Sequence, residues 1–303
     1  MKIVLAGGTG FIGTTLRRKL ISAGHEVIVL TRQAATEGTE REVFVAWDAK
    51  TSGDWTSRLD GVDAVINLAG DNIAAQRWTS VRKQKLISSR VDATRAIVNA
   101  IAQAKQKPAV LINASAVGYY GDADDRELTE KDPEGTGFLA ATCNQWETEA
   151  HKVEPLGVRL VVFRLGPVLG EQGGMLSKMI PPFLFFVGAP LGTGKQWISW
   201  VHIEDVIGAI FFALSSSEIS GSLNIASGTP VTMKEFCHVL ARALRRPCWP
   251  SLPSFFIRMM LGEMAAIILS SQRVIPRKLL EAGYLFRHTD LSRAFEAILR
   301  KSA

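Results

Sequence analysis

Three side chains in the middle of the chain could move a proton: Ser115, Tyr119 and Cys143. Ser115 ends the apolar segment 109–115, which predicts a strand, and Tyr119 follows four residues later in a loop. Cys143 lies in segment 138–150, which contains no Gly or Pro and is predicted to be a helix. Ligands of α/β sheets bind at the carboxyl ends of strands, so these groups predict a proton-transfer site there.

Each of these residues also has a structural interpretation. Cys143 is typical of a small buried hydrophobic side chain, and we favour this interpretation over a nucleophile or acid. Tyr119 and Tyr120 could pack and hydrogen-bond within their loop, and this alternative stays open. The group His202, Glu204 and Asp205 is more typical of a helix start than of a catalytic set, and the sequence predicts no metal site.

A glycine-rich loop follows the first apolar segment. Gly7, Gly10 and Gly13 have the spacing G-x-x-G-x-x-G, and Thr9, Phe11 and Ile12 complete the loop. The first glycine permits a tight turn, the second lets backbone approach a pyrophosphate, and the third lets the helix pack closely. Because the loop lies between a predicted strand and a predicted helix, the pattern indicates a dinucleotide site rather than an ordinary turn.

The end of the second predicted strand bears on the choice of dinucleotide. NAD sites usually place an acid there, whereas this chain has Thr31 and Arg32. A guanidinium can bind a 2′-phosphate in a bidentate fork, so we predict NADP(H); the alternative is a solvated surface arginine. Asp48 could meet the adenine amino group, and Leu68, Ala69 and Gly70 are expected to line the adenosine ribose with backbone.

The elements that position these residues alternate along the first half of the chain. Strands followed by helices predict a parallel sheet with helices on both faces, so the fold class is α/β, a Rossmann-type doubly wound parallel sheet. After residue 166 the pattern becomes a long loop region with a short helix near 176–180, then a strand, and a capping box at Thr232 opens another helix. The predicted strands are 2–6, 26–30, 42–47, 63–69, 109–115, 158–166 and 222–226, and the helices are 11–24, 79–105, 138–150 and 233–245.

Composition narrows the class of protein. The 303 residues carry a net charge of +6, but the basic residues are scattered without an aromatic ladder, so we expect no nucleic-acid partner. Three cysteines without pairing or metal spacing suit a reducing compartment, with the cytoplasm or an organelle stroma as the default. The most apolar stretch, 180–192, is too short to span a bilayer and contains three prolines, so we expect no membrane partner.

With these features in place, the chain resembles the short-chain dehydrogenase/reductase superfamily in its extended, epimerase-like form. More narrowly, it is similar to an atypical epimerase branch that has its own short C-terminal domain. The resemblance implies an NAD(P)-binding domain over 1–245, with a Rossmann core at about 1–165 and a smaller discontinuous substrate region within 166–245. Residues 246–303 would form the helical C-terminal domain. The motifs are GGTGFIG at 7–13, NLAG at 67–70, SAVGYYG at 115–121, RLGPVLG at 164–170, WVHIEDVIGAI at 200–210 and the tail at 250–286.

The resemblance fails at the catalytic dyad. Family enzymes use a Tyr with a Lys four residues later, but none of the three tyrosines here has that partner. The resemblance places Leu139 at the Tyr position and Cys143 at the Lys position. It implies that Arg90 replaces a helper Asn and that Ser115 is retained, although the register at Ser115 and Ala116 is open by one residue.

The family pattern also implies further cofactor contacts and a function. Lys85 and Arg90 would face the nicotinamide ribose and the diphosphate, and Val168, with Gly166 and Pro167, would pass near the nicotinamide. The expected function is that of an NADP(H)-dependent oxidoreductase or epimerase-like enzyme acting on a small molecule. The alternative is a non-catalytic NADP(H)-responsive sensor or regulator, as cell-division labels on some relatives suggest. Two long helices that pair across a two-fold axis in the extended family imply a homodimer.

Overall fold

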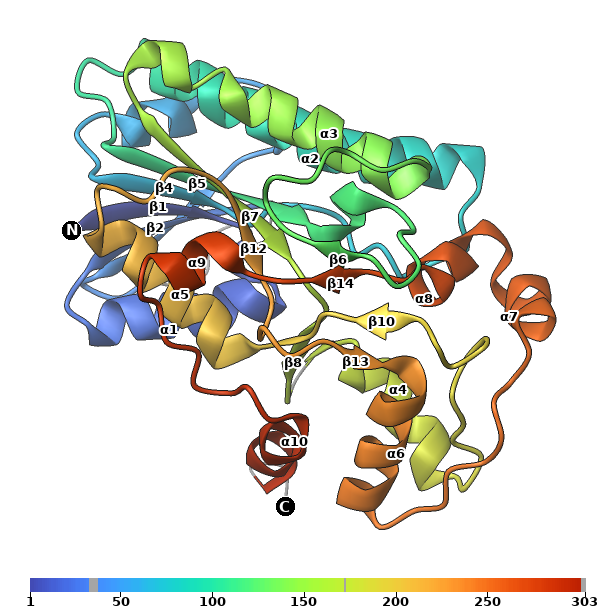
Figure 1. Cartoon of the computed structure of the whole chain (residues 1–303). Helices are drawn as coiled ribbons and strands as arrows, with labels where there is room; N and C mark the ends of the chain where they lie inside the picture. Colours follow the sequence, from blue (N-terminus) through green and yellow to red (C-terminus); the bar gives the residue numbers. More distant parts are fainter. Residues whose placement is uncertain (33–37, 172, 301–303) are drawn as a thin grey trace.

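The computed structural model describes residues 1–32, 38–171 and 173–300. Its centre is a seven-stranded parallel sheet in the order β12-β7-β5-β4-β1-β2-β3 (Figure 1). The order reverses between β1 and β4, and ligands bind at such a switch point in doubly wound sheets. The strands are β1 Lys2–Ala6, β2 Glu26–Thr31, β3 Glu42–Ala46, β4 Ala64–Asn67, β5 Val110–Ala116, β7 Arg159–Leu165 and β12 Gly221–Ile225.

Two layers of helices cover the sheet. The odd-numbered side chains of β1, such as Ile3 and Leu5, pack on α1 and α5, whereas Val4 and Ala6 face α2 and the end of α3. Because the strands are buried on both faces, they appear in the sequence as continuous apolar runs. The helices are α1 Phe11–Ser22, α2 Ser80–Gln103, α3 Phe138–His151 and α5 Ile203–Ser215, with 3-10 turns η1 Asp54–Leu59, η2 Val117–Tyr120 and η3 Glu154–Leu156.

A second, smaller region lies beyond the carboxyl ends of the strands. Its core joins Trp200, Phe183, Phe236 and Phe295, which come from distant segments of the chain. Figure 1 shows α4, α6 and α10 gathered below the sheet, with short strands between them and the sheet. The elements are β8 Val168–Gly170, β9 Gly173–Gly174, α4 Leu176–Leu184, β10 Trp197–Ile198, β11 Val201–His202, β13 Val231–Thr232, α6 Met233–Leu244 and α10 Leu291–Arg300.

The tail is mainly helical, as expected, but it also contributes to a sheet. The two-residue strand β14 pairs in parallel with β6, which lies between β5 and α3 in the chain. Within the described ranges, none of the helices combines the length and the hydropathy needed to cross a bilayer. The elements are β6 Glu127–Leu128, α7 Ser254–Leu261, η4 Gly262–Ala265, α8 Ala266–Leu269, β14 Arg273–Val274 and α9 Arg277–Glu281.

The expected Rossmann-type α/β class is confirmed, and the main difference lies in the short helix after residue 175. The short helix expected at 176–180 continues to Leu184 through Pro181 and Pro182. The helix continues because Phe183 and Leu176 bury their side chains in the second core and Phe185 still donates to the carbonyl of Pro181. The predicted helix start at Thr232 is confirmed, since its side chain accepts a hydrogen bond from the backbone N–H of Glu235.

Candidate functional site

The glycine loop joins β1 to α1 with no space for side chains at two positions. Gly7 has φ +77°, and a Cβ there would lie 2.6 Å from the carbonyl of Leu68. A Cβ on Gly13 would lie 2.1 Å from the carbonyl oxygen of Gly7. Helix α1 has no side-chain cap and no acidic residue in its first turn, so its backbone N–H groups are suited to bind an anion. The loop therefore fits a pyrophosphate.

The remaining residues of the glycine loop differ in burial, and Phe11 packs against the smaller region. Thr9 is exposed and Ile12 is half-buried. The ring of Phe11 packs on the β8–β9 hairpin, where a Cβ on Gly173 would lie 2.7 Å from the ring. Val168 begins this hairpin and pairs with Val201 of β11, so the loop and the smaller region are in direct contact.

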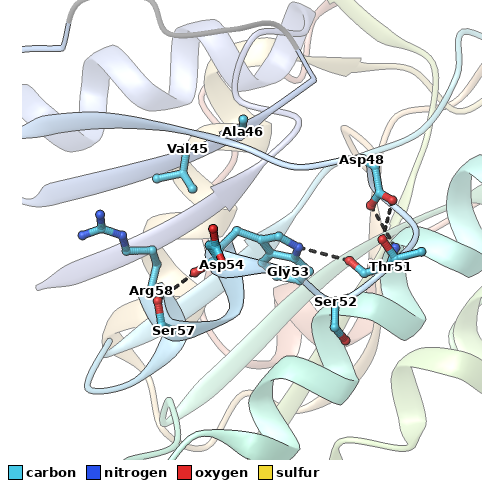
Figure 2. Close-up of a pocket in the computed structure, with 10 residues that line it drawn as sticks. Val45, Ala46, Asp48, Thr51, Ser52, Gly53, Asp54, Ser57 and Arg58 are labelled. Carbon is cyan, nitrogen blue, oxygen red and sulfur yellow. Dashed lines mark hydrogen bonds between the residues drawn. The ribbon is translucent and has the colours of Figure 1, made fainter.

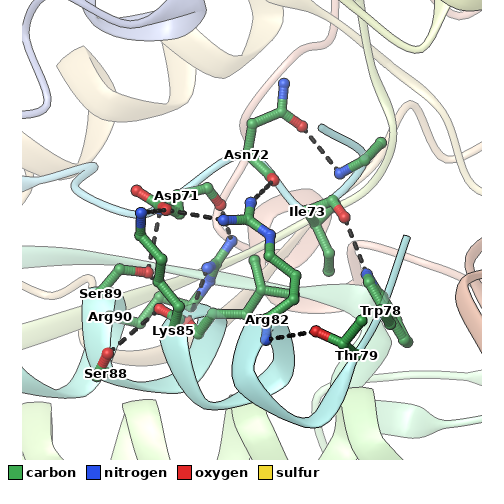
Figure 3. A network of polar contacts seen from close by, with 12 residues as sticks. Asp71, Asn72, Ile73, Trp78, Thr79, Arg82, Lys85, Ser88, Ser89 and Arg90 are labelled. Carbon is green, nitrogen blue, oxygen red and sulfur yellow. Dashed lines mark hydrogen bonds and ion pairs between the residues drawn. The ribbon is translucent and has the colours of Figure 1, made fainter. Parts of the chain in front are cut away.

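Three cations converge on the carboxylate of Asp71, four residues after β4. Figure 3 shows two of them, Arg82 and Lys85, beside Asp71. Nη1 of Arg82 lies 3.0 Å from Asp71, while Nζ of Lys85 and Nη1 of Arg32 each lie 3.6 Å from it. Arg82 and Asp71 are 10% and 13% exposed, whereas Arg32 and Lys85 are 68% and 62% exposed. Since one negative charge faces three positive charges, two of which reach solvent, the cluster retains a capacity for an anion.

The charge state of Asp71 follows from these neighbours. Burial would raise the pKa of its carboxyl, but the hydrogen bond from Arg82 and the charges of Lys85 and Arg32 together lower that pKa. Asp71 is therefore ionised at neutral pH. Neither Asp71 nor Arg82 was among the residues predicted from the sequence, although Asp71 directly follows the NLAG motif at 67–70.

Arg90 lies at the inner side of the same cluster. Its guanidinium donates to the carbonyls of Leu86 and Asp71, at 3.0 and 3.1 Å, and stacks on the ring of Trp146. Burial lowers the pKa of Arg90. Gly70 leaves space for this side chain, because a Cβ there would lie 3.3 Å from the guanidinium carbon. The structure thus groups Lys85 with Arg32 and directs Arg90 toward α3.

Asp48 stands at the edge of a cavity of about 490 Å³ that β3 forms with the segment 51–58 (Figure 2). Its carboxylate accepts hydrogen bonds from the backbone N–H groups of Lys50 and Thr51 and from the Thr51 hydroxyl. The bonds from Thr51, first of all that from its hydroxyl, lower the pKa of Asp48. Oδ2 accepts one of these bonds and retains a lone pair, so an adenine amino group can still be accommodated.

A row of polar side chains crosses three strands at their carboxyl ends. Ser115 of β5 pairs with Arg164 of β7, which pairs with Asn224 of β12. Opposite them on α3, the carboxylate of Glu147 accepts a 2.6 Å hydrogen bond from Ser115 and lies 2.8 Å from Nη2 of Arg164. Burial alone would lower the pKa of Arg164, but the hydrogen bonds and charge of Glu147 raise it above its usual range. This buried ion pair was not predicted from the sequence.

The two loop tyrosines have different environments. Tyr120 is buried, accepts a hydrogen bond from Arg164 and donates one to Asn224. Burial raises the pKa of Tyr120 to about 12. Tyr119 is half-buried, and the guanidinium carbon of Arg164 lies 3.4 Å from its ring centroid. Tyr120 therefore belongs to the framework, whereas Tyr119 keeps a partly accessible ring.

Cys143 packs beneath the turn η2. A Cβ on Gly118 would lie 3.3 Å from Leu139 and 3.9 Å from the sulfur of Cys143, so α3 and η2 are in close contact there. Burial, followed by the charge of Glu147, raises the pKa of the Cys143 thiol to about 11. The thiol is consequently protonated at neutral pH, which suits packing and not nucleophilic attack.

The predicted helix start at His202, Glu204 and Asp205 joins α5 to the tail through His288, which was not predicted from the sequence. His202 caps α5 as expected of a helix start, its Nδ1 accepting from the backbone N–H of Glu204. His288 stacks on the His202 ring with centroids 3.7 Å apart and lies 3.1 Å from Glu204. Asp205 accepts the backbone N–H groups of Arg287 and His288, and burial raises the pKa of its carboxyl. His202, Glu204 and His288 bring their ligand atoms within 4.8 Å of one another.

The glycine loop and the cation cluster at a switch point define a nucleotide-binding protein of the Rossmann type. Residues 3–226 match the NAD dependent epimerase/dehydratase family, and residues 252–298 match a domain of unknown function, DUF1731. The chain belongs to the NAD dependent epimerase/dehydratase family and carries the second domain as its tail.

Full-length relatives support this assignment. The epimerase family protein YfhF of Bacillus subtilis is 39% identical, and the alignment covers 99% of this chain and 98% of that one. A chloroplastic SDR39U1 homologue of Arabidopsis thaliana is 36% identical over 99% and 87% of the two chains. The crystal structure of human epimerase family protein SDR39U1 with NADPH has a TM-score of 0.89 and 32% identity, and covers 99% of both chains.

Proposed function

We propose that the protein binds NADP(H) and uses it to reduce or epimerise a small molecule. The observation that carries the proposal is the cluster at Asp71, where Arg32 and Lys85 expose their charged ends beside the ends of β2 and β4. A 2′-phosphate is the feature that distinguishes NADP from NAD, and two exposed cations suit it. The NADPH complex of the human relative points in the same direction.

Different residues of this chain would bind different parts of NADP(H). The α1 N-terminus at Gly10 would hold the diphosphate, Arg32 and Lys85 the 2′-phosphate, and Leu68 to Gly70 the adenosine ribose. Val168, beside Gly166 and Pro167, would border the nicotinamide. When bound, the nicotinamide supplies or accepts a hydride.

The proton that accompanies hydride transfer is best assigned to Tyr119. The Cys143 thiol is buried under Gly118, and the Ser115 hydroxyl donates to Glu147, so neither group faces solvent. Tyr119 is half-buried, and the positive charge of Arg164 lies against its ring. A phenol without an adjacent ammonium is a poor base at neutral pH but a usable acid, so we expect reduction by NADPH to be faster than oxidation by NADP.

Calorimetric titration of NADPH and NADH tests the cofactor assignment. The wild type should bind NADPH more tightly, and Arg32→Asp should weaken NADPH binding by about 1.5–3 kcal/mol while changing NADH binding little. Lys85→Gln should act in the same direction. Lys83→Gln is the matched control, because Lys83 lies on the same helix but pairs with Glu263. Equal affinities of the wild type for the two cofactors would exclude the proposal.

A second candidate is a non-catalytic NADP(H)-responsive sensor. The observation that favours it is that Cys143 is buried and protonated. The family resemblance assigns Cys143 and Leu139 to the usual dyad positions. A screen of carbonyl compounds and nucleotide sugars separates the two candidates. Consumption of NADPH with any of them supports the enzyme, whereas tight NADPH binding with no turnover across the screen supports the sensor.

We further propose a homodimer and a reducing compartment. Helices α2 and α3 lie side by side over one face of the sheet, the position expected for a helical dimer interface (Figure 1). Cys143, Cys237 and Cys248 are free thiols, which suits the cytoplasm or an organelle stroma.

A further inference from the structure

Exposed apolar side chains are concentrated in two short segments. Of the fourteen large hydrophobic residues exposed in the described part of the chain, nine lie within 184–187 and 249–260. Phe185 is 77% exposed, Phe255 69% and Met260 63%. Scattered exposed residues are normal, but such a concentration marks an interaction surface. We call these two segments the apolar face.

The two segments of the apolar face are in contact where the second segment begins, at Trp249 and Leu252. The indole N–H of Trp249 donates to the carbonyl of Phe186 at 2.7 Å, and Leu191 forms a parallel bridge with Leu252. Helix α7 begins two residues later at Ser254 and buries only Ile257. Four of its apolar side chains are exposed: Phe255, Phe256, Met259 and Met260. Figure 1 shows α7 at the right of the molecule, with α4 and α6 below it.

The charge around the apolar face is mainly positive. Asp125 and Glu263 are acidic residues near it, and Glu263 is paired with Lys83. The segments 175–195 and 236–262 contain six lysines and arginines and no aspartate or glutamate. One of them, Arg246, stacks on the ring of Phe186 at 4.7 Å, and another, Arg258, lies on α7 itself. None of the six makes an ion pair within the part of the chain that the structure describes. They are Lys178, Lys195, Arg242, Arg245, Arg246 and Arg258.

We propose that the apolar face is a docking surface for an anionic lipid bilayer. Protruding Phe, Trp and Met side chains can enter the headgroup boundary while adjacent Arg and Lys side chains pair with lipid phosphates. A second copy of this chain is a poorer occupant, because a two-fold contact would bring the same unpaired cations together. The earlier prediction of no membrane partner was based on the absence of a segment long enough to span a bilayer. Binding to the surface of a bilayer does not need such a segment.

Co-sedimentation with vesicles tests the proposal. The protein should bind vesicles of phosphatidylcholine with phosphatidylglycerol, bind pure phosphatidylcholine much less, and be released by high salt. The variant Arg245→Asn with Arg258→Gln should bind roughly 30-fold more weakly, since each cation near the surface strengthens binding about fivefold. Asn is chosen because residue 245 has φ +55°. Phe185→Ser with Phe255→Ser should also reduce binding.

Matched controls are Arg18→Gln for charge and Leu285→Ser for exposed apolar area, because Leu285 is 84% exposed in another segment. Circular dichroism confirms that each variant is folded. No binding to anionic vesicles, or equal losses in the test and control variants, would overturn the proposal. The proposal would also be overturned if the wild type is a dimer and the variant Phe185→Ser with Phe255→Ser is a monomer. A second copy of the chain would then cover the apolar face.

Discussion

Ser115, Tyr119 and Cys143 surround one buried ion pair. Glu147 binds Ser115 and Arg164, and Arg164 in turn lies against the ring of Tyr119. A buried pair of this kind is costly to break, because removing one partner leaves an unpaired charge. Single substitutions at Glu147 or Arg164 would therefore report on folding, and only substitutions at the rim of the network can report on chemistry.

Tyr119→Phe is the informative substitution at that rim. If Tyr119 donates the proton, its loss should lower turnover by about 10²–10⁴ while NADPH affinity is unchanged. Cys143→Ala should reduce turnover less, because the thiol packs against Gly118 and is protonated. Steady-state rates and calorimetric affinities of both variants measure this. Loss of turnover in Cys143→Ala alone would instead identify the thiol as the catalytic group.

The same thiol predicts a dependence of stability on pH. Its pKa is raised to about 11 in the folded protein, whereas an unfolded thiol ionises near pH 8.5. The unfolded state therefore releases a proton that the folded state keeps, and stability falls as pH rises from about 9 to 11. In denaturant titrations, the unfolding free energy of the wild type should fall between pH 8 and pH 10. The fall in Cys143→Ala should be smaller by about 1–2 kcal/mol. Equal losses would show that the thiol ionises normally in the folded protein.

Among the elements, those with a strong local pattern could be predicted and those made by tertiary contact could not. Helix α2 was expected at 79–105 and spans Ser80–Gln103, because its cap and apolar spacing lie within the segment. The pairing of β14 with β6 has no such signal, since each strand has two residues and their register comes from the folded tail. Likewise Arg32 predicted a phosphate site, but the contribution of Asp71 and Arg82 depends on where β4 ends.

Helices α2 and α3 also carry the prediction of a dimer. Light scattering at high protein concentration should give about twice the 33.0 kDa of one chain. Ala141 is an exposed small residue of α3, so Ala141→Arg should shift the mass toward one chain without unfolding the protein. Leu285→Arg, in the exposed tail, should not. A wild-type mass of one chain would exclude the α2–α3 dimer.

At the scale of the whole molecule, α10 closes the smaller region. Its residues Leu291, Phe295 and Ile298 are buried against α6, with the ring of Phe295 edge-on to Phe236 at 5.2 Å. A chain ending at Asp290 should expose this core and become sensitive to protease within 166–245. The sheet of seven strands should survive and continue to bind NADPH, because β12 precedes the deletion. Proteolysis with NADPH titration measures both effects, and uniform resistance of the shortened chain would contradict the role given to α10.

The position of α10 also matters while the protein is being made. The sheet is complete once β12 has left the ribosome, so the nucleotide-binding half can fold on the nascent chain. The smaller region cannot, because its core waits for Phe295 and Ile298, which are translated much later. Until α10 has been translated, the apolar side chains around Phe236 are exposed, and chaperones and proteases can bind them. Synonymous codons that slow translation between 245 and 290 would lengthen that exposure and lower the yield of protein, even though the amino-acid sequence is unchanged.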